Sequence, residues 1–106
     1  MSYTKVNYRD VDELGGGLHF MRDSLECEQL GFTIVECQPN WTGKRHDHAE
    51  EHHEEIYYLV SGSATLVVDG VDVPLEPGDA VRISPTDTRQ LRNGDTESLL
   101  VVAGAP

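Results

Sequence analysis

The residues best suited to chemistry lie in one acidic, histidine-rich run. Four of the five histidines fall at positions 46, 48, 52 and 53, and Glu55 follows directly before an apolar segment. On an extended segment, His46 and His48 point to the same face because side chains alternate with a period of two. Two imidazoles and a carboxylate from the next strand suit a divalent metal such as zinc, nickel, manganese or iron. A solvated loop is the simpler interpretation, but the clustering of histidines favours a binding role.

Short apolar segments must position these residues. They are rich in β-branched side chains and are separated by turn residues, which favours strands over helices. The predicted strands span residues 32–37, 56–60, 64–68, 71–75, 80–83 and 99–102. Residues 9–14 could form one helical turn. Many short strands with close turns predict an all-β sandwich or barrel.

Turn residues set the connections between these strands. Asp69-Gly70 predicts a two-residue hairpin turn, because both central positions of that turn need a positive φ. Residues 61–62 and 77–79 mark further turns. Pro74 predicts an edge strand, or an amide position that faces away from a partner strand.

Size and charge limit the partners. A chain of 106 residues predicts one domain over residues 1–106. The formal net charge is −11, with 19 acidic and eight basic residues, so neither nucleic acid nor an anionic membrane is an expected partner. Lys5 and Lys44 are the only lysines. An acidic, lysine-poor composition is typical of halophilic proteins and equally compatible with an ordinary acidic one.

The chain has the marks of a cytoplasmic protein. It contains no apolar run long enough to span a membrane, and its first residues lack the charged-then-apolar pattern of a signal peptide. Cys27 and Cys37 are the only cysteines. Without a secretory context, we expect them to be reduced thiols.

Two motifs resemble those of the cupin superfamily. Gly43-x-x-His46-x-His48, followed by Glu55 and, after six residues, Gly62, is similar to the first cupin motif. The gap from His48 to Glu55 is longer than usual in that family, which implies an extended loop. Residues 77–85 and Asn93 resemble the second motif. The resemblance spans residues 43–93.

The resemblance implies a cupin double-stranded β-helix, a jelly-roll barrel. It also implies that His46, His48 and Glu55 are metal ligands. His52 or His53 of the extended loop could act as a substitute ligand.

One position departs from the family pattern. Arg89 stands where the second motif supplies a third histidine ligand, and a guanidinium cannot bind a metal ion. Three interpretations stay open: a metal held without a third histidine, a metal-free pair of Arg89 with Glu55, or an anionic ligand held by Arg89. A fourth interpretation places Arg89 on the outer face, paired with surface acids.

Two aromatic residues are candidates for ligand contact. Tyr57 shares a strand face with Glu55 and Leu59 by alternation, so it could line the cavity or only pack the barrel. Trp41 lies in a loop that the family pattern puts at the mouth, where it could stack on a ligand or cap the core.

Two functional hypotheses remain at this stage, and the fold does not choose between them. One is a metal-dependent enzyme of isomerase or dioxygenase type that acts on a small polar molecule. The other is a non-enzymatic, metal-free protein that binds or senses a small ligand in the same cavity, with Arg89 paired with Glu55 or with an anionic ligand. We also expect a homodimer, because small barrels leave open sheet edges and residues 3–7 resemble a strand that could pair across the interface.

Overall fold

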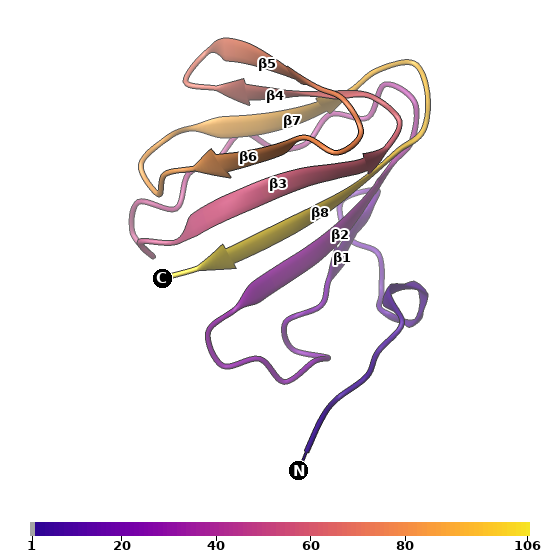
Figure 1. Ribbon diagram of the computed structural model, residues 1–106, viewed down its shortest axis with the longest axis vertical. Coiled ribbons are helices and arrows are strands. Elements are labelled where there is room, and N and C mark those ends of the chain that lie inside the picture. Colours follow the sequence, from indigo (N-terminus) through magenta and orange to yellow (C-terminus); the bar gives the residue numbers. More distant parts are fainter. Residues whose placement is uncertain (1) are drawn as a thin grey trace.

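Short antiparallel strands make up most of the computed structural model, which describes residues 2–106 (Figure 1). The strands are β1 (Leu18–Phe20), β2 (Gly31–Cys37), β3 (Glu54–Ser61), β4 (Ala64–Val68), β5 (Val71–Leu75), β6 (Ala80–Ile83), β7 (Arg89–Asn93) and β8 (Ser98–Ala105). A 3-10 helix, η1 (Tyr8–Asp10), begins one residue before the predicted helical turn and covers only the first two of its residues. The all-β prediction is confirmed, with the bounds of β4, β5 and β6 as predicted.

Two strands were missed by the sequence analysis. β1 has only three residues, too few for a periodic pattern. β7 has the sequence Arg-Gln-Leu-Arg-Asn, in which one apolar residue stands among polar ones. Its first and third residues, Arg89 and Leu91, nevertheless face the interior and are buried. Polar residues at inward positions conceal a strand from a search for apolar alternation.

The strands form two sheets that enclose the interior of a jelly roll. One sheet has the order β1-β2-β8-β3-β6 and the other β5-β4-β7. In Figure 1 the three-stranded sheet lies at the top, and β8 runs between β2 and β3 below it. Every strand pairing is antiparallel. The order joins strands far apart in sequence, as a jelly roll requires.

The turn residues act as the sequence predicted. Asp69 and Gly70 connect β4 to β5 with φ values of 48° and 81°, so both have the positive φ of a tight hairpin turn. Pro74 lies in β5, which forms the edge of the three-stranded sheet. An edge strand has a partner on one side only, so a proline whose nitrogen faces the unpaired side removes no hydrogen bond between strands.

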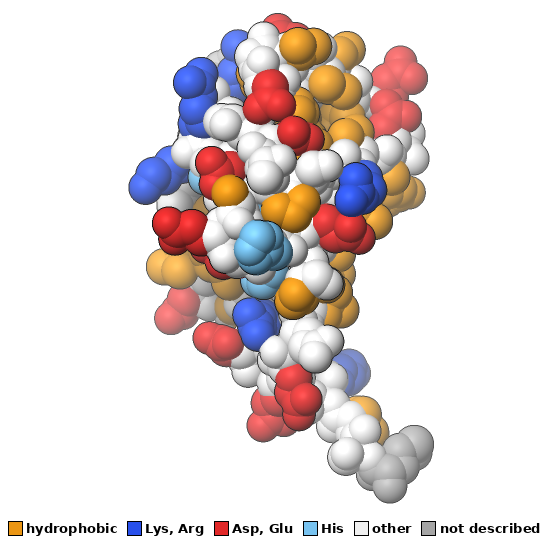
Figure 2. Space-filling view, turned by 90° about the vertical axis from the view of Figure 1, so that its left-hand side faces the viewer, with side chains coloured by type: hydrophobic (Ala, Val, Ile, Leu, Met, Phe, Trp, Pro, Cys, Tyr) orange, Lys and Arg blue, Asp and Glu red, His pale blue; other side chains and the backbone are white. Residues whose placement is uncertain are grey.

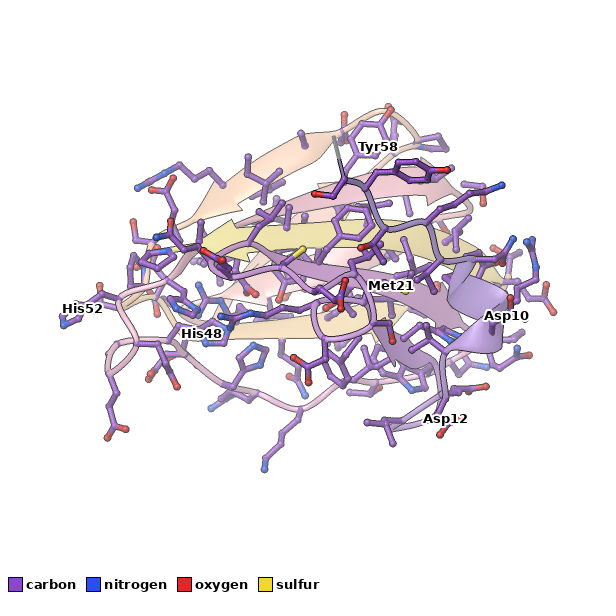
Figure 3. All side chains as sticks on the ribbon, turned by 90° about the horizontal axis from the view of Figure 1, so that it is seen from below. Asp10, Asp12, Met21, His48, His52 and Tyr58 are labelled. Carbon is purple, nitrogen blue, oxygen red and sulfur yellow. The ribbon has the colours of Figure 1, made fainter. Side chains whose placement is uncertain are left out.

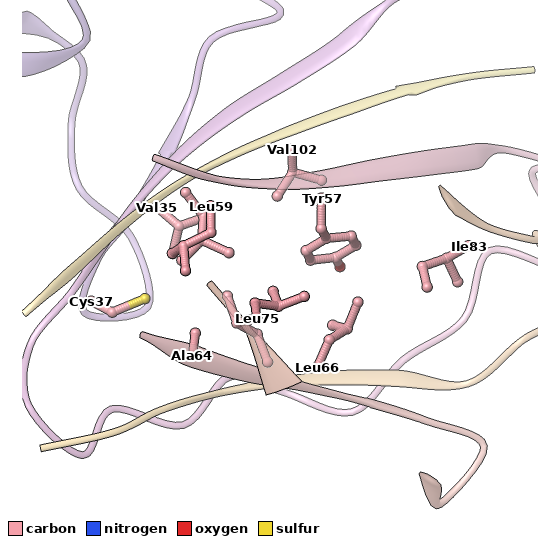
Figure 4. Close-up of a cluster of buried hydrophobic side chains, with 11 residues drawn as sticks. Val35, Cys37, Tyr57, Leu59, Ala64, Leu66, Leu75, Ile83 and Val102 are labelled. Atoms are coloured by element: carbon pink, nitrogen blue, oxygen red, sulfur yellow. The ribbon is translucent and has the colours of Figure 1, made fainter. Parts of the chain in front are cut away.

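The core lies between the sheets and extends from one end of the barrel toward the other (Figure 4). Its buried members are Val35, Cys37, Tyr57, Leu59, Ala64, Leu66, Leu75, Ile83, Leu91, Leu100 and Val102. In β3, Tyr57 and Leu59 face inward, whereas Tyr58 faces outward and is 41% exposed. The predicted common face of Glu55, Tyr57 and Leu59 is therefore confirmed.

The N-terminal segment extends away from the sheets in Figure 1. Residues 3–7 lie outside the strands described here, and Tyr3 is 83% exposed. No helix in residues 2–106 has the length and apolar character needed to cross a membrane.

Candidate metal centre and ligand cavity

The segment that carries His46 and His48 is hydrogen-bonded along β7. The Gly43 amide donates to the carbonyl of Leu91 at 2.8 Å, and His46 and Arg89 exchange two backbone hydrogen bonds of 2.8 and 2.9 Å. The amide of His48 then donates to the carbonyl of Pro85 at 2.9 Å. This pairing holds the segment extended, so that both imidazoles line the same cavity, with His46 exposed and His48 half-buried.

His46, His48 and Glu55 converge at one end of the barrel. One ligand atom from each lies within 4.8 Å of the others. The two rings are 5.0 Å apart and nearly perpendicular, and Nε2 of His48 lies 3.4 Å from Oε2 of Glu55. Two atoms bound to one metal at about 2.1 Å can be no more than about 4.2 Å apart. A small side-chain adjustment would therefore bring all three into coordination distance.

Neighbouring groups orient both imidazoles. Nδ1 of His46 lies 3.0 Å from the carbonyl oxygen of Lys44, and because a carbonyl only accepts, this nitrogen carries the proton and donates. Its Nε2 then presents a lone pair. Nδ1 of His48 lies 3.5 Å from a carboxylate oxygen of Glu51, while its Nε2 faces Glu55. Such outer partners are typical of metal-binding histidines.

Arg89 lies inside the barrel, so its assignment to the outer face is wrong. The side chain is fully buried because Arg89 and Leu91 occupy the inward positions of β7. Nη2 donates to the carbonyl of Ser84 at 2.9 Å, and Nε lies 3.9 Å from Oε1 of Glu55. Within residues 2–106, Nε and Nη1 have no hydrogen-bond partner. A buried guanidinium thus lies near Oε1 of the candidate ligand Glu55, whereas His48 lies near Oε2.

The donor set fits a divalent transition metal. Two neutral imidazoles and one carboxylate are ligands that zinc, nickel, manganese and iron accept, and they leave coordination positions open. Arg89 opposes this fit in two ways, since it contributes no donor and its positive charge favours anions over cations. The residues therefore fit a metal, and we expect a weaker site than one with a third histidine.

Tyr57 supports the carboxylate from inside the barrel. Its hydroxyl donates to Oε1 of Glu55 at 3.4 Å. Burial raises the pKa of Tyr57 well above its usual range, and the negative charge of Glu55 raises it further against the opposing effect of Arg89. The side chain therefore keeps its proton at neutral pH and remains a hydrogen-bond donor beside the site.

The extended loop places its two histidines differently. Figure 3 shows His52 at the outer tip of the loop and His48 turned toward the interior. The ring of His53 lies 6.0 Å from that of His48, and His53 is outside the three-residue group within 4.8 Å. Figure 2 shows histidine side chains near the middle of this end of the molecule, among charged side chains.

A cavity of about 340 Å³ opens beside the three candidate ligands. It is lined by Leu18, Phe20, Thr33, Val35, Trp41, Gly43, Lys44, His46, His48, Glu55, Tyr57, Leu91 and Val102. Trp41 lines it and also packs against the core, while its indole nitrogen donates to the carbonyl of Gly15 at 2.9 Å. Both interpretations of Trp41 are therefore compatible with its position.

Several lining residues escaped the sequence analysis. Leu18 and Phe20 come from the unpredicted β1, and Leu91 from the unpredicted β7. Lys44 lies between two motif positions, and its place two residues before His46 on an extended segment could have indicated that it shares the same face.

Two antiparallel sheets that enclose a His-His-Glu cluster define a cupin-type barrel. The family model described as a cupin domain matches residues 33–103, and the chain belongs to this family. No curated protein matches the chain.

Solved structures agree with this fold. A cupin protein from Bacteroides fragilis is 26% identical over 95% of this chain and 86% of its own, with a TM-score of 0.74. KdgF from Halomonas sp. is 20% identical over 100% of this chain and 94% of its own, with a TM-score of 0.77. A sugar phosphate isomerase of the cupin superfamily from Silicibacter pomeroyi is 18% identical over 96% of this chain and 75% of its own, with a TM-score of 0.75.

Proposed function

We propose that this cupin binds a small molecule at a divalent transition metal held by His46, His48 and Glu55. The observation that carries the proposal is the convergence of three ligand atoms within 4.8 Å beside a cavity of about 340 Å³. Such a metal, when bound, would act as a Lewis acid with open positions for a ligand. A metal-dependent enzyme of isomerase or dioxygenase type is one form of this function.

Neighbouring residues would orient the metal ligands and enclose the bound molecule. Tyr57 donates a hydrogen bond to Glu55 and so fixes one carboxylate oxygen. The carbonyl of Lys44 accepts a hydrogen bond from Nδ1 of His46 and so orients the His46 imidazole toward the cavity. Trp41 and Phe20 line the cavity and would exclude water from the bound molecule.

A second candidate function needs no metal. Arg89 is fully buried beside Glu55, and two of its nitrogens have no partner in residues 2–106. A shift of less than about 1 Å would bring Glu55 Oε1 from 3.9 Å into hydrogen-bond distance of Arg89 Nε. In that arrangement Glu55 is engaged by Arg89 and the cavity binds a small polar or anionic ligand directly.

Metal binding separates the two candidates. Calorimetric titration of zinc, nickel and manganese into chelator-treated protein at neutral pH should show binding to the wild type. Arg89→His should bind at least tenfold more tightly, because it adds an imidazole and removes a positive charge. His48→Ala should bind at least tenfold more weakly.

The matched control is His52→Ala, which removes a histidine from the outer tip of the same loop and should leave the affinity unchanged. If the wild type binds none of the three metals and Arg89→His gains nothing, the metal proposal is wrong and the metal-free function replaces it.

We also propose a homodimer. The outward side chains of β3, Ile56, Tyr58 and Val60, are 47%, 41% and 44% exposed, and they form an apolar row on the outer face of the five-stranded sheet. Apolar rows of this kind are typical of interfaces. In a symmetric dimer, the row on one copy would pack against the same row on the other copy. The exposed residues 3–7 extend from the body and could reach across to the partner.

Light scattering over a wide range of protein and salt concentration should give the mass of a dimer. Tyr58→Lys should give a monomer, whereas Val71→Lys, at a position that is 64% exposed on the edge strand β5, should leave the dimer intact. A wild-type monomer under all conditions would reject the proposal.

The thiols support a cytoplasmic location, which we retain as a proposal. Cys27 is half-buried, Cys37 is buried, and both are free. A reducing compartment keeps cysteines in this form.

A further inference from the structure

The cavity has an uneven distribution of polar and apolar groups. Its walls are mostly apolar and partly aromatic, formed by Leu18, Phe20, Val35, Trp41, Leu91 and Val102. Its polar side chains include one connected group, in which Tyr57 and His48 both contact Glu55 and the ring of His46 packs against that of His48. A ligand that fills the cavity therefore meets polar groups with one end and apolar walls with the rest.

The charges around the polar group favour an anionic end. Arg89 lies 3.9 Å behind Glu55 and offsets its negative charge. Lys44 then faces the cavity as a positive charge, and the described lining residues include no carboxylate besides Glu55. A bound metal would add positive charge, so the preference for an anion holds with or without it.

We propose that the cavity takes a small carboxylate with an apolar body of about one ring, its carboxylate at Lys44 and its ring at the wall formed by Trp41 and Phe20. This inference deepens the proposed small-molecule function and rests on it for the identity of the site. The volume of about 340 Å³ lies at the lower end of the range for small-molecule sites, which limits the ligand to a compact body.

The same walls disfavour a sugar phosphate. Its hydroxyl groups would lie against apolar side chains, and each hydroxyl left without a partner lowers affinity by roughly tenfold. A hydrophobic body on the same anionic group instead gains from leaving water. This chain would thus differ in ligand class from the sugar phosphate isomerase that shares its fold.

Trp41 allows a direct measurement, because it is the only tryptophan and it lines the cavity. We would titrate the protein with phenylacetate, acetate and glucose 6-phosphate at neutral pH and follow tryptophan fluorescence, with calorimetry as the second readout. Phenylacetate should bind at least tenfold more tightly than acetate and glucose 6-phosphate. Equal or tighter binding of glucose 6-phosphate, or no binding of phenylacetate at 10 mM, would overturn the inference.

Two variants test the parts of the ligand separately. Phe20→Ser should weaken phenylacetate binding at least fivefold without affecting acetate binding, because Phe20 would contact only the proposed ring. Phe20 is 49% exposed and outside the core cluster, so the fold should tolerate the change. Lys44→Met should weaken both carboxylates. Leu30→Ser is the matched control, since Leu30 is 47% exposed and does not line the cavity.

The zinc titration of the same wild-type protein separates this inference from the proposed metal centre. Phenylacetate binding without zinc binding would retain the ligand class and reject the metal. Zinc binding together with a preference for glucose 6-phosphate would retain the metal and reject the ligand class.

Discussion

The two ends of the barrel, which strand β7 connects, differ in whether their buried polar groups have hydrogen-bond partners. At its last residue, Asn93, the side-chain nitrogen donates to the carbonyls of Gln38 and Thr96 at 2.7 Å each. The Ser98 hydroxyl lies 2.6 Å from Oδ1 of Asn93 and accepts from the amide of Ser63 at 3.0 Å. At the first residue of the strand, Arg89, two buried nitrogens lack partners within residues 2–106.

This difference separates a structural role from a binding role. The end around Asn93, here called the closed end, satisfies its polar groups within the chain and so specifies one arrangement. The end around Arg89, His46, His48 and Glu55, here called the open end, leaves two buried nitrogens of Arg89 without partners in the described residues and places the other three side chains beside a cavity. Polar groups that converge on a cavity, with incomplete hydrogen bonding behind them, are typical of a binding site.

The strongest test of the closed end is Gly62→Ala. Gly62 has a φ of +88°, and a Cβ there would lie 2.3 Å from Oγ of Ser98 and 2.4 Å from the carbonyl oxygen of Glu97. Strain and overlap together should lower the free energy of unfolding by about 2–5 kcal/mol, measured by urea denaturation. Gly70→Ala is the control, because Gly70 has a φ of +81° and open space around it. Equal losses for the two variants would show that close packing at the closed end adds nothing.

At alkaline pH, the burial of Cys37 in the core should lower the stability of the folded chain. Burial raises the pKa of Cys37 to about 11 from an ordinary value near 9. Between these values the unfolded chain loses the thiol proton while the folded chain keeps it, so stability falls as pH rises from about 9 to 11. The free energy of unfolding should fall by up to roughly 3 kcal/mol more in the wild type than in Cys37→Ala over this range. Parallel pH profiles of the two proteins would contradict this.

At the open end, Arg89→Met should cost little. The change removes one hydrogen bond to the carbonyl of Ser84, but it also removes two buried donors that lack partners in the described chain. Two buried donors without partners are themselves unfavourable, and Glu55 keeps its contacts with Tyr57 and His48 after the change, so we expect a loss below about 1 kcal/mol or a gain in urea denaturation. A loss above about 3 kcal/mol would indicate that the guanidinium is fully paired in solution and that the two ends do not differ.

Salt should have the smallest effect and should not distinguish the ends. The net charge of −11 acts over the whole surface, and its self-repulsion is screened by ions. The melting temperature should rise by a few degrees between 0.1 and 2 M potassium chloride, and by the same amount in Gly62→Ala. A flat or falling melting temperature would argue against a salt-adapted surface.

Local sequence patterns were enough to predict much of the fold and part of the candidate site. The strands β4, β5 and β6 follow from apolar segments, and the turn at Asp69 and Gly70 follows from its need for positive φ. The spacing of His46 and His48 predicted a shared face because strand side chains alternate. Each of these results depends on residues close in sequence, which is why the sequence by itself determined them.

Only the tertiary structure decided what surrounds the site. The sequence left Arg89 open between the barrel interior and the outer face, and the pairing of β7 with β4 and with the histidine segment turns it into the barrel beside Glu55. The apolar walls likewise come from Phe20, Trp41 and Val102, which no local pattern connects. Burial, electrostatic pairing and cavity shape depend on contacts between distant segments, so they follow from the packing of the sheets and not from the order of residues along the chain.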